Sequence, residues 1–337
     1  MFKVAILVEK SLADSLFLKR DLEFLGTFAQ FNPVEELPAK ITLEFMDEKL
    51  ENADACITCW RTPTFTKELL DRHPKLRFIM HGAGAVRNLV CPEFWDMKGR
   101  HISSNAPIIA KDVAQTTLAF MMPSLKQFWQ MSAMIRSGMW KGGEAGNFTT
   151  MNVDKDLKVG LIGCSLVGKE VIQILKPFGC SIKVWDPYMS PIEAEMLGVE
   201  KAELNDLLST SDVVSMHAPA NEDCRNIINA QNLPLIRDGA VFINTARGLE
   251  VDETALIEEL KKGRFFACLD VTSPEPPAMD NPLRTLPNVI LTPHMAGGHA
   301  MQNRSLMGRN AIKEVYNYLT KGLIAYEVRG EMLSHMA

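Results

Sequence analysis

The sequence predicts an α/β protein of two doubly wound parallel-sheet domains with a cleft between them. Its 337 residues correspond to about two domains of the typical ~150 residues. The hydrophobic fraction of 47% and the charged fraction of 23% disfavour collagen-like, coiled-coil and disordered chains. Short apolar runs rich in β-branched residues alternate with longer amphipathic segments, which is typical of βαβ units around a parallel sheet.

The first alternating series fills roughly the first hundred residues. The turn Gly82-Ala83-Gly84 follows its last strand and opens the next element. Residues 91–106, rich in Pro, Gly, Ser and Asn, break the pattern. We expect strands at 3–8, 28–31, 55–58 and 76–81, and helices at 14–25, 42–52 and 64–72.

A long helical pattern from Lys111 to Arg136 leads to a second series. This segment is apolar on most sides, so we expect it to be buried between domains or against a second subunit. Pro123 should break or kink it. After a polar stretch at 138–156, we expect strands at 158–162, 181–185, 213–216, 240–244, 265–271 and 289–292, and an amphipathic helix from Gln302 to Lys321.

The charge balance makes two kinds of partner poor candidates. With 36 basic and 41 acidic residues the net charge is −5, which lacks the positive surface that nucleic acid or an anionic membrane requires. No apolar run reaches the ~18 residues of a membrane span, and the first strand is too short for a signal-peptide core. The seven scattered cysteines suit reduced thiols in the cytoplasm.

No metal or redox centre is expected. Cys56 and Cys59 form a C-x-x-C pair inside an apolar run, but alternation along a strand places their thiols on opposite faces. His294 and His299 have no third ligand close in the sequence, and a zinc site needs at least three.

The strongest motif is a glycine-containing turn between a predicted strand and a predicted helix. The strand 158–162 runs into Gly163-Cys164-Ser165-Leu166-Val167-Gly168, which is the dinucleotide fingerprint in its required context. Gly163 allows the tight turn, and Gly168 lets helix and strand pack closely. The first amides of the helix, Leu166 and Val167 among them, would face the pyrophosphate. Ser165 replaces the middle glycine, and its hydroxyl can donate to a phosphate oxygen.

Asp186 lies 23 residues after Gly163, at the end of the next strand. A carboxylate there accepts hydrogen bonds from the adenosine ribose hydroxyls and repels a 2′-phosphate. The predicted cofactor is therefore NAD rather than NADP. The alternative is a βαβ turn that binds nothing, but the strand, helix, second strand and terminal acid at the right distances favour the cofactor site.

Arg247, Glu275 and His294 each follow a predicted strand of the second series, where doubly wound folds bind ligands. Together they suit hydride transfer to a carbonyl. An arginine pairs with the substrate carboxylate and polarises the adjacent carbonyl. A histidine passes the proton while a carboxylate fixes its tautomer, and a nicotinamide carries the hydride. Singly, Arg247 could be a surface ion pair, Glu275 a solvated charge and His294 a helix cap, but their joint occurrence favours a catalytic site.

These motifs make the chain resemble the D-isomer-specific 2-hydroxyacid dehydrogenases. The resemblance rests on the dinucleotide turn with Asp186 and on the segments 244–253, 270–276 and 292–294, and it covers nearly the whole chain. It implies that Arg247 binds and orients the oxo acid, and that Glu275 pairs with His294, the general acid/base.

The resemblance also implies a division of the chain and further site residues. Residues 1–105 and 297–337 would form a flavodoxin-like substrate domain, and residues 106–296 a Rossmann NAD-binding domain. The substrate carboxylate would meet Gly82, Ala83 and Gly84; the adenosine would lie between Ala218 and Pro219; and the nicotinamide half of the site would be lined by Thr245, Ala246, Asp270 and Gly297.

Two positions depart from the family pattern. Residues 85–88, Ala-Val-Arg-Asn, replace an acidic stretch that commonly follows the glycine turn, which could alter the choice of substrate. Gln115 stands where glutamate is usual, which should affect packing.

The predicted activity is the NAD-dependent interconversion of a small 2-oxo acid and a D-2-hydroxy acid. Glu275 argues against formate dehydrogenases, which resemble this family but pair the histidine with glutamine. Phosphoglycerate oxidation is possible, and glyoxylate or hydroxypyruvate reduction fits equally. The alternatives are a non-catalytic NAD(H)-sensing regulator of the same fold and a scaffold that binds no dinucleotide. The long apolar helix and the resemblance also imply a homodimer.

Overall fold

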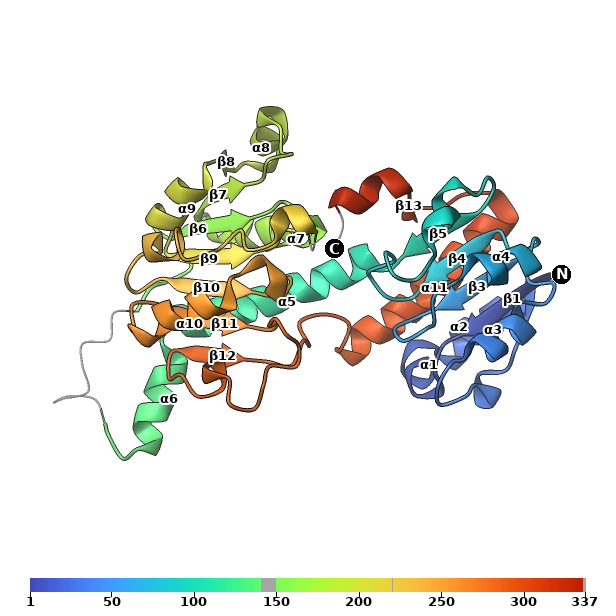
Figure 1. Ribbon diagram of the computed structural model, residues 1–337, viewed down its shortest axis with the longest axis horizontal. Coiled ribbons are helices and arrows are strands. Elements are labelled where there is room, and N and C mark those ends of the chain that lie inside the picture. Colours follow the sequence, from blue (N-terminus) through green and yellow to red (C-terminus); the bar gives the residue numbers. More distant parts are fainter. Residues whose placement is uncertain (141–149, 220, 336–337) are drawn as a thin grey trace. The chain divides into compact units, whose positions relative to one another are not determined.

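The computed structural model describes residues 1–140, 150–219 and 221–335, which form two compact units. The first unit comprises Met1–Asp112 with Gly298–Met336, and the second comprises Val113–Gly297. Each unit is a sheet with helices on both faces (Figure 1). We expected the boundaries between the two domains after residues 105 and 296. In the structure the boundaries between the two units follow Asp112 and Gly297. Within the described ranges, no helix is long and apolar enough to cross a membrane.

The first unit is built on a six-stranded sheet with the order β13-β5-β4-β3-β1-β2. The strands β1 to β5 pair in parallel, and β13 pairs antiparallel with β5. The order 2-1-3-4-5 is flavodoxin-like, which confirms the predicted fold of this unit. The strands are β1 (Phe2–Leu7), β2 (Ala29–Phe31), β3 (Ala55–Thr58), β4 (Phe78–His81), β5 (His101–Ser104) and β13 (Glu327–Val328).

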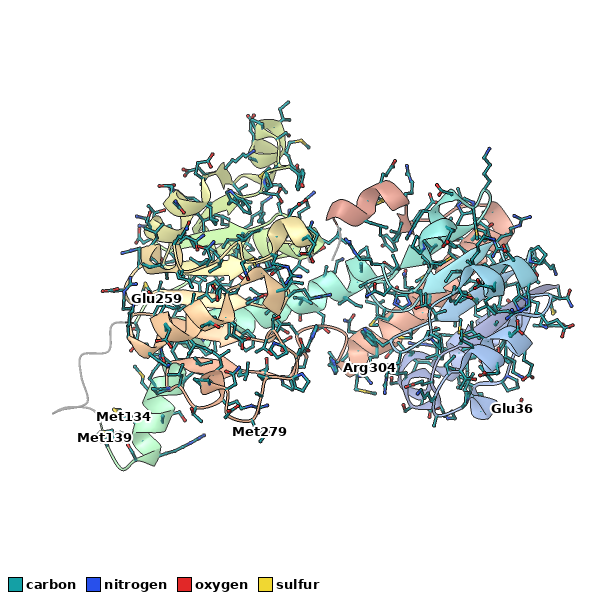
Figure 2. All side chains as sticks on the ribbon, viewed as in Figure 1. Glu36, Met134, Met139, Glu259, Met279 and Arg304 are labelled. Atoms are coloured by element: carbon teal, nitrogen blue, oxygen red, sulfur yellow. The ribbon has the colours of Figure 1, made fainter. Side chains whose placement is uncertain are left out.

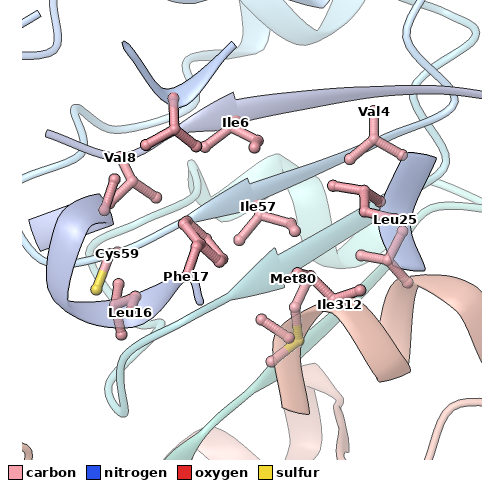
Figure 3. Packing of buried hydrophobic residues seen from close by; sticks show 14 of the residues in the cluster. Val4, Ile6, Val8, Leu16, Phe17, Leu25, Ile57, Cys59, Met80 and Ile312 are labelled. Atoms are coloured by element: carbon pink, nitrogen blue, oxygen red, sulfur yellow. The ribbon is translucent and has the colours of Figure 1, made fainter. Parts of the chain in front are cut away.

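Both faces of this sheet are covered because side chains alternate along its buried strands. Val4 and Ile6 pack with α1, α2 and α11 in one core (Figure 3), whereas Ala5 packs with α3 and α4 in the other. Cys59 belongs to the first core and Cys56 to the second, so their thiols do lie on opposite faces. The helices are α1 (Lys10–Leu16), α2 (Lys19–Gly26), α3 (Leu43–Leu50), α4 (Lys67–Arg72) and α11 (Met301–Lys321).

The second unit is built on a seven-stranded parallel sheet with the order β12-β11-β10-β9-β6-β7-β8. Counted from β6 this is 7-6-5-4-1-2-3, the Rossmann order with one added strand, which confirms the predicted fold. The order reverses between β6 and β9, so the turn after β6 lies at the topological switch point. The strands are β6 (Lys158–Ile162), β7 (Ser181–Trp185), β8 (Glu200–Lys201), β9 (Val213–Met216), β10 (Val241–Asn244), β11 (Phe266–Leu269) and β12 (Val289–Leu291).

Alternating side chains divide the core of the second unit in the same way. Val159 and Val184 pack with α5 and α7 on one face, and Ile162 and Val214 pack with α9 and α10 on the other. The helices are α5 (Ala106–Leu125), α6 (Phe128–Arg136), α7 (Leu166–Leu175), α8 (Pro191–Leu197), α9 (Leu204–Thr210) and α10 (Glu253–Lys261). Of the predicted polar stretch, residues 141–149 lie outside the described residues.

The long helix predicted at 111–136 is in fact two helices. α5 begins at Ala106 and continues through Pro123, because Met121 and Leu125 are held in the core on either side of the proline. The break comes at Gln127, whose φ of +52° is left-handed. Eight of the twenty residues of α5 are buried, whereas α6 has no residue buried within the chain.

Two further expectations were wrong. The helix predicted at 14–25 is split into α1 and α2 by the extended backbones of Phe17 and Leu18, next to the point where Gly308 of α11 packs against the Leu16 carbonyl. The segment 91–106, expected to be irregular, contains β5. Its residues are polar in part, but Ser103 and Ser104 are buried, and their backbone pairs with β4 and β13.

Candidate active site

The turn after β6 can be made only with glycine at its two ends. Gly163 has a φ of +93°, and a Cβ on it would lie 2.6 Å from the backbone of Ala218, which follows β9. A Cβ on Gly168 would lie 2.6 Å from the Gly163 carbonyl oxygen. The two glycines therefore bring β6, β9 and the start of α7 to the closest approach that their backbones allow.

Ser165 is the N-cap residue of α7. Its backbone is extended, and its hydroxyl oxygen lies 3.5 Å from the amide nitrogen of Gly168, as a capping serine does. Leu166 and Val167 then form the first turn of the ten-residue helix, at the positive end of its dipole. This glycine-walled turn at a helix N-terminus fits the pyrophosphate of a dinucleotide.

Asp186 follows β7 directly, beside the turn. Its Oδ2 accepts a hydrogen bond from the amide of Cys164 at 2.7 Å, and its Oδ1 accepts one from the amide of Tyr188 at 2.8 Å. The carboxylate is therefore fixed at the adjacent ends of β6 and β7, and each oxygen retains a lone pair for a ligand hydroxyl.

The other wall of the turn is the segment His217-Ala218-Pro219 after β9. Ala218 is buried and Pro219 is half-buried. His217 is 1% exposed, and burial lowers its pKa to about 3. Its Nε2 lies 2.9 Å from the Ser215 hydroxyl. This histidine is a neutral support of the turn, and its burial keeps it away from proton transfer.

The position of Arg247 is fixed by hydrogen bonds to backbone groups of its own loop, which follows β10. The Asn244 side chain donates to the Arg247 carbonyl at 2.8 Å and accepts from the Ala246 amide at 2.9 Å. The Arg247 guanidinium donates to the Ala246 carbonyl at 2.6 Å and is half-buried. The hydroxyl of Thr245 lies 3.1 Å from that of Thr117 on α5.

Gly248 ties the Arg247 loop to the loop after β11. A Cβ on Gly248 would overlap the carbonyl group of Thr272, so a larger residue would push the two loops apart. The sequence shows Gly248 beside Arg247 but does not show this contact, because Thr272 is distant in the chain.

Asp270 clamps the loop that carries His294. Its Oδ1 accepts from the Thr292 hydroxyl at 2.5 Å and the Met295 amide at 2.9 Å, and its Oδ2 accepts from the Ala296 amide at 2.8 Å. His294 itself has a φ of +51°, which is uncommon for a residue with a side chain. The carboxylate predicted to line the nicotinamide is therefore also the anchor of this left-handed turn.

Glu275 and His294 are brought together at the same edge of the sheet. His294 Nδ1 lies 2.6 Å from Glu275 Oε1, and their side chains are 43% and 41% exposed, so the ring can reach a ligand. A hollow of about 390 Å³ beside the pair is lined in part by Asp270, Thr272 and Arg284. With Nδ1 engaged, Nε2 is the ring nitrogen available for proton transfer.

Glu253, which the sequence did not single out, supports the Glu275 loop. It is the first residue of α10, and its carboxylate accepts from the Ser273 amide at 2.9 Å and from the Asn281 side chain at 2.8 Å. Apart from its place at the end of the segment 244–253, its sequence signal is an acidic residue in the first turn of a helix, which also occurs for capping alone.

The glycine turn Gly82-Ala83-Gly84 belongs to the first unit, where it follows β4. The Gly82 amide donates to the Thr58 carbonyl at 2.7 Å, and a Cβ on Gly82 would lie 2.8 Å from that oxygen. Asn105, missed by sequence reasoning, is fully buried. Its side-chain amide donates to the carbonyls of Gly82 and Met307, which fixes the turn against α11.

Two buried cysteine thiols are unsuited to redox or metal chemistry. Burial raises the pKa of Cys59 to about 12 and that of Cys164, in the dinucleotide turn, to about 11, so neither is a thiolate near neutral pH. In the described part of the chain, no group of three or more His, Cys, Asp or Glu side chains could hold a metal ion.

Two doubly wound units, one with a dinucleotide turn at its switch point and a histidine–carboxylate pair at the carboxyl ends of the same sheet, are the arrangement expected of a nicotinamide-dependent oxidoreductase. Residues 118–296 match the family model of the D-isomer specific 2-hydroxyacid dehydrogenase, NAD binding domain. The chain therefore belongs to the D-isomer specific 2-hydroxyacid dehydrogenases, a family of NAD-dependent oxidoreductases.

Two relatives and one solved structure illustrate the membership. A D-3-phosphoglycerate dehydrogenase of Methanocaldococcus jannaschii is 32% identical over 87% of this chain, which spans 55% of that protein. A glyoxylate reductase of Thermococcus litoralis is 31% identical over 74% of this chain and 75% of its own. The structure of a D-2-hydroxyisocaproate dehydrogenase has the same fold, with a TM-score of 0.81 at 22% identity over 98% of this chain and 100% of that one.

Proposed function

We propose that this protein interconverts a small 2-oxo acid and a D-2-hydroxy acid with NAD(H) as cofactor. The observation that carries the proposal is the His294–Glu275 pair, 2.6 Å apart and half exposed, on a loop that Asp270 clamps at the edge of the dinucleotide-binding sheet. A histidine held in one tautomer at such a place suits a proton that accompanies a hydride.

Each residue has a separate task in this proposal. Bound nicotinamide supplies or accepts the hydride. Arg247 binds the substrate carboxylate and polarises the neighbouring carbonyl. His294 donates a proton from Nε2 to the carbonyl oxygen during reduction and takes it back during oxidation, while Glu275 stabilises the protonated ring through Nδ1.

The cofactor site would be formed by the second unit alone, and the first unit would contribute the glycine turn that meets the substrate carboxylate. The pyrophosphate would lie on the start of α7, where Gly163 and Gly168 leave no room for side chains. The proposed cofactor-binding residues are Gly163, Ser165, Leu166, Val167, Gly168, Asp186, Ala218, Pro219, Thr245, Ala246, Asp270 and Gly297; the proposed substrate-binding residues are Gly82, Ala83, Gly84 and Arg247.

The test of this function is NADH oxidation with a panel of 2-oxo acids: glyoxylate, pyruvate, hydroxypyruvate, phenylpyruvate and branched-chain oxo acids, with 3-phosphoglycerate and NAD⁺ for the reverse direction. We expect turnover with at least one of the small acids, since the named relatives include a glyoxylate reductase and a phosphoglycerate dehydrogenase. Binding of NADH without turnover of any compound would instead favour the NAD(H)-sensing regulator. That alternative is not favoured by the relatives, which are named dehydrogenases and reductases.

We propose that NAD is preferred over NADP because of Asp186. Its carboxylate is fixed by the amides of Cys164 and Tyr188, where it would accept from ribose hydroxyls and repel a 2′-phosphate. Asp186→Ser should lower the ratio of kcat/KM for NADH to that for NADPH about tenfold or more, since an unpaired charge contact is worth at least ~1.4 kcal/mol. The Asp206→Ser variant, which removes an exposed partner of Lys183, should keep the wild-type ratio; an unchanged ratio in Asp186→Ser would contradict the assignment.

A homodimer is proposed from the surface of α6 and the residues that follow it. Phe128 and Ile135 are 59% and 45% exposed, and Met139 and Trp140 are 47% and 70% exposed; Figure 2 labels Met134 and Met139 in this region. Such an exposed apolar group typically marks an interface. Sedimentation should give a dimer at micromolar concentration and a monomer for Phe128→Glu with Ile135→Glu. The matched control Met279→Glu, at a residue 85% exposed elsewhere, should stay dimeric, and a monomeric wild type would refute the proposal.

We also propose a cytoplasmic location. All seven cysteines are free, which suits a reducing compartment.

A further inference from the structure

Glu250 is a buried acid with no assigned role, three residues after Arg247. It ends the short 3-10 helix Gly248–Glu250 and is 0% exposed. Its Oε2 accepts a hydrogen bond from the Arg247 amide at 3.3 Å. Its Oε1 is buried and has no hydrogen-bond partner among the described residues.

The surroundings of Glu250 disfavour a charge. The next residue, Val251, and the facing residues Cys224 and Ile228 belong to one hydrophobic core, and the Glu250 carbonyl accepts from the Ile228 amide at 3.1 Å. Burial raises the pKa of Glu250 to about 8, although the Arg247 amide and the Arg247 charge act in the opposite direction. At neutral pH the side chain is therefore mainly a neutral acid.

We propose that Glu250 is a positioning residue for Arg247, which it holds as a neutral acid, and that its ionisation weakens the binding of an anionic substrate. The inference rests on the proposed function, in which Arg247 binds the carboxylate of the oxo acid. An ionised Glu250 would place a negative charge next to the arginine in apolar surroundings, where charges are poorly screened. It would then compete with the substrate for the guanidinium.

Arg247 acts on the ionisation of Glu250, and Cys224 is a neighbouring ionisable group that Glu250 affects. Arg247 lies in the loop of Glu250, and Cys224 lies in the facing segment 222–224. Burial raises the pKa of Cys224 to about 11, so this thiol stays neutral over the range in which Glu250 titrates. Arg247 is therefore the charged group whose interactions change when Glu250 ionises.

The test compares the pH dependence of KM for the best 2-oxo acid in three variants. Between pH 6.5 and 9.5, we expect KM of the wild type to rise about tenfold more than that of Glu250→Gln, with kcat in the two proteins within about twofold. Glu250→Leu, which cannot accept a hydrogen bond from the Arg247 amide, should have a raised KM at every pH. Glu250→Gln, which can accept that bond, should keep the low KM. Glu259→Gln, a buried glutamate of α10 paired with Lys262, should follow the wild-type profile.

A spectroscopic readout tests the same inference without turnover. Infrared difference spectra of the wild type should show the carbonyl stretch of a protonated carboxylic acid at pH 7, which is lost above pH 8 and absent from Glu250→Gln. Calorimetry with oxamate, a small anionic analogue of a 2-oxo acid, should show the same variant-dependent loss of affinity. Parallel pH profiles for the wild type and Glu250→Gln, or the absence of that band at pH 7, would overturn the inference. Failure of the whole oxo-acid panel while oxamate still binds in this pH-dependent way would refute the proposed reaction alone.

Discussion

Replacement of His294 by alanine should lower kcat about a thousandfold while NADH still binds with nearly wild-type affinity. General acid–base groups contribute about 10²–10⁴ to rate, and His294 is the only half-exposed imidazole that the described structure pairs with a carboxylate at the edge of the dinucleotide-binding sheet. The dinucleotide turn follows β6 and contacts the residues after β7 and β9. Removal of the His294 ring should therefore not disturb it. NADH titration by fluorescence and steady-state turnover measure the two effects separately.

The chain offers a matched control for this experiment. His101 Nδ1 also lies 2.6 Å from a glutamate oxygen, that of Glu327, but at the β5–β13 edge of the first unit. His101→Ala should therefore retain turnover. If His294→Ala kept most of the wild-type rate, the proposed acid/base role would be wrong, and loss of NADH binding together with turnover would indicate a structural effect instead.

Arg247→Gln should lower kcat/KM for the oxo acid about a thousandfold. Loss of one partner of a desolvated, hydrogen-bonded charge pair costs ~2–5 kcal/mol, and ~4 kcal/mol corresponds to about three orders of magnitude. Arg247→Lys should be intermediate, because lysine keeps the charge but loses the planar fork that matches a carboxylate. Kinetics at saturating NADH measure both variants.

Arg225 provides the control for Arg247. It lies in the same unit and pairs with the exposed carboxylate of Glu222, so Arg225→Gln should keep the wild-type kcat/KM. Rates of Arg247→Gln within a few-fold of the wild type would show that the substrate carboxylate is bound elsewhere.

Much of the fold could be predicted from local patterns. The alternation of strand and helix patterns predicted two sheets of parallel strands, because strand and helix periodicity are properties of neighbouring residues. The antiparallel strand β13 at the edge of the first sheet was not predicted. The glycines of the turn after β6 also predicted the dinucleotide turn, which lies at the topological switch point of the second sheet. Boundaries were less predictable where packing overrides propensity: α5 continues through Pro123 because its apolar side chains are held in the core, and the polar strand β5 forms because its backbone has partners on both sides.

The sequence by itself determined the chemistry available to this protein: a dinucleotide turn, an arginine, a glutamate and a histidine, each at the end of a parallel strand. This follows because turn glycines and strand ends are encoded locally. Only the tertiary structure decided that Asp270 clamps the His294 loop, that Gly248 touches Thr272, and that Glu250 is buried with its side chain against the Arg247 amide. Those features depend on which distant segments pack together, and the burial of a polar side chain is set by its neighbours in space rather than by its neighbours in the chain.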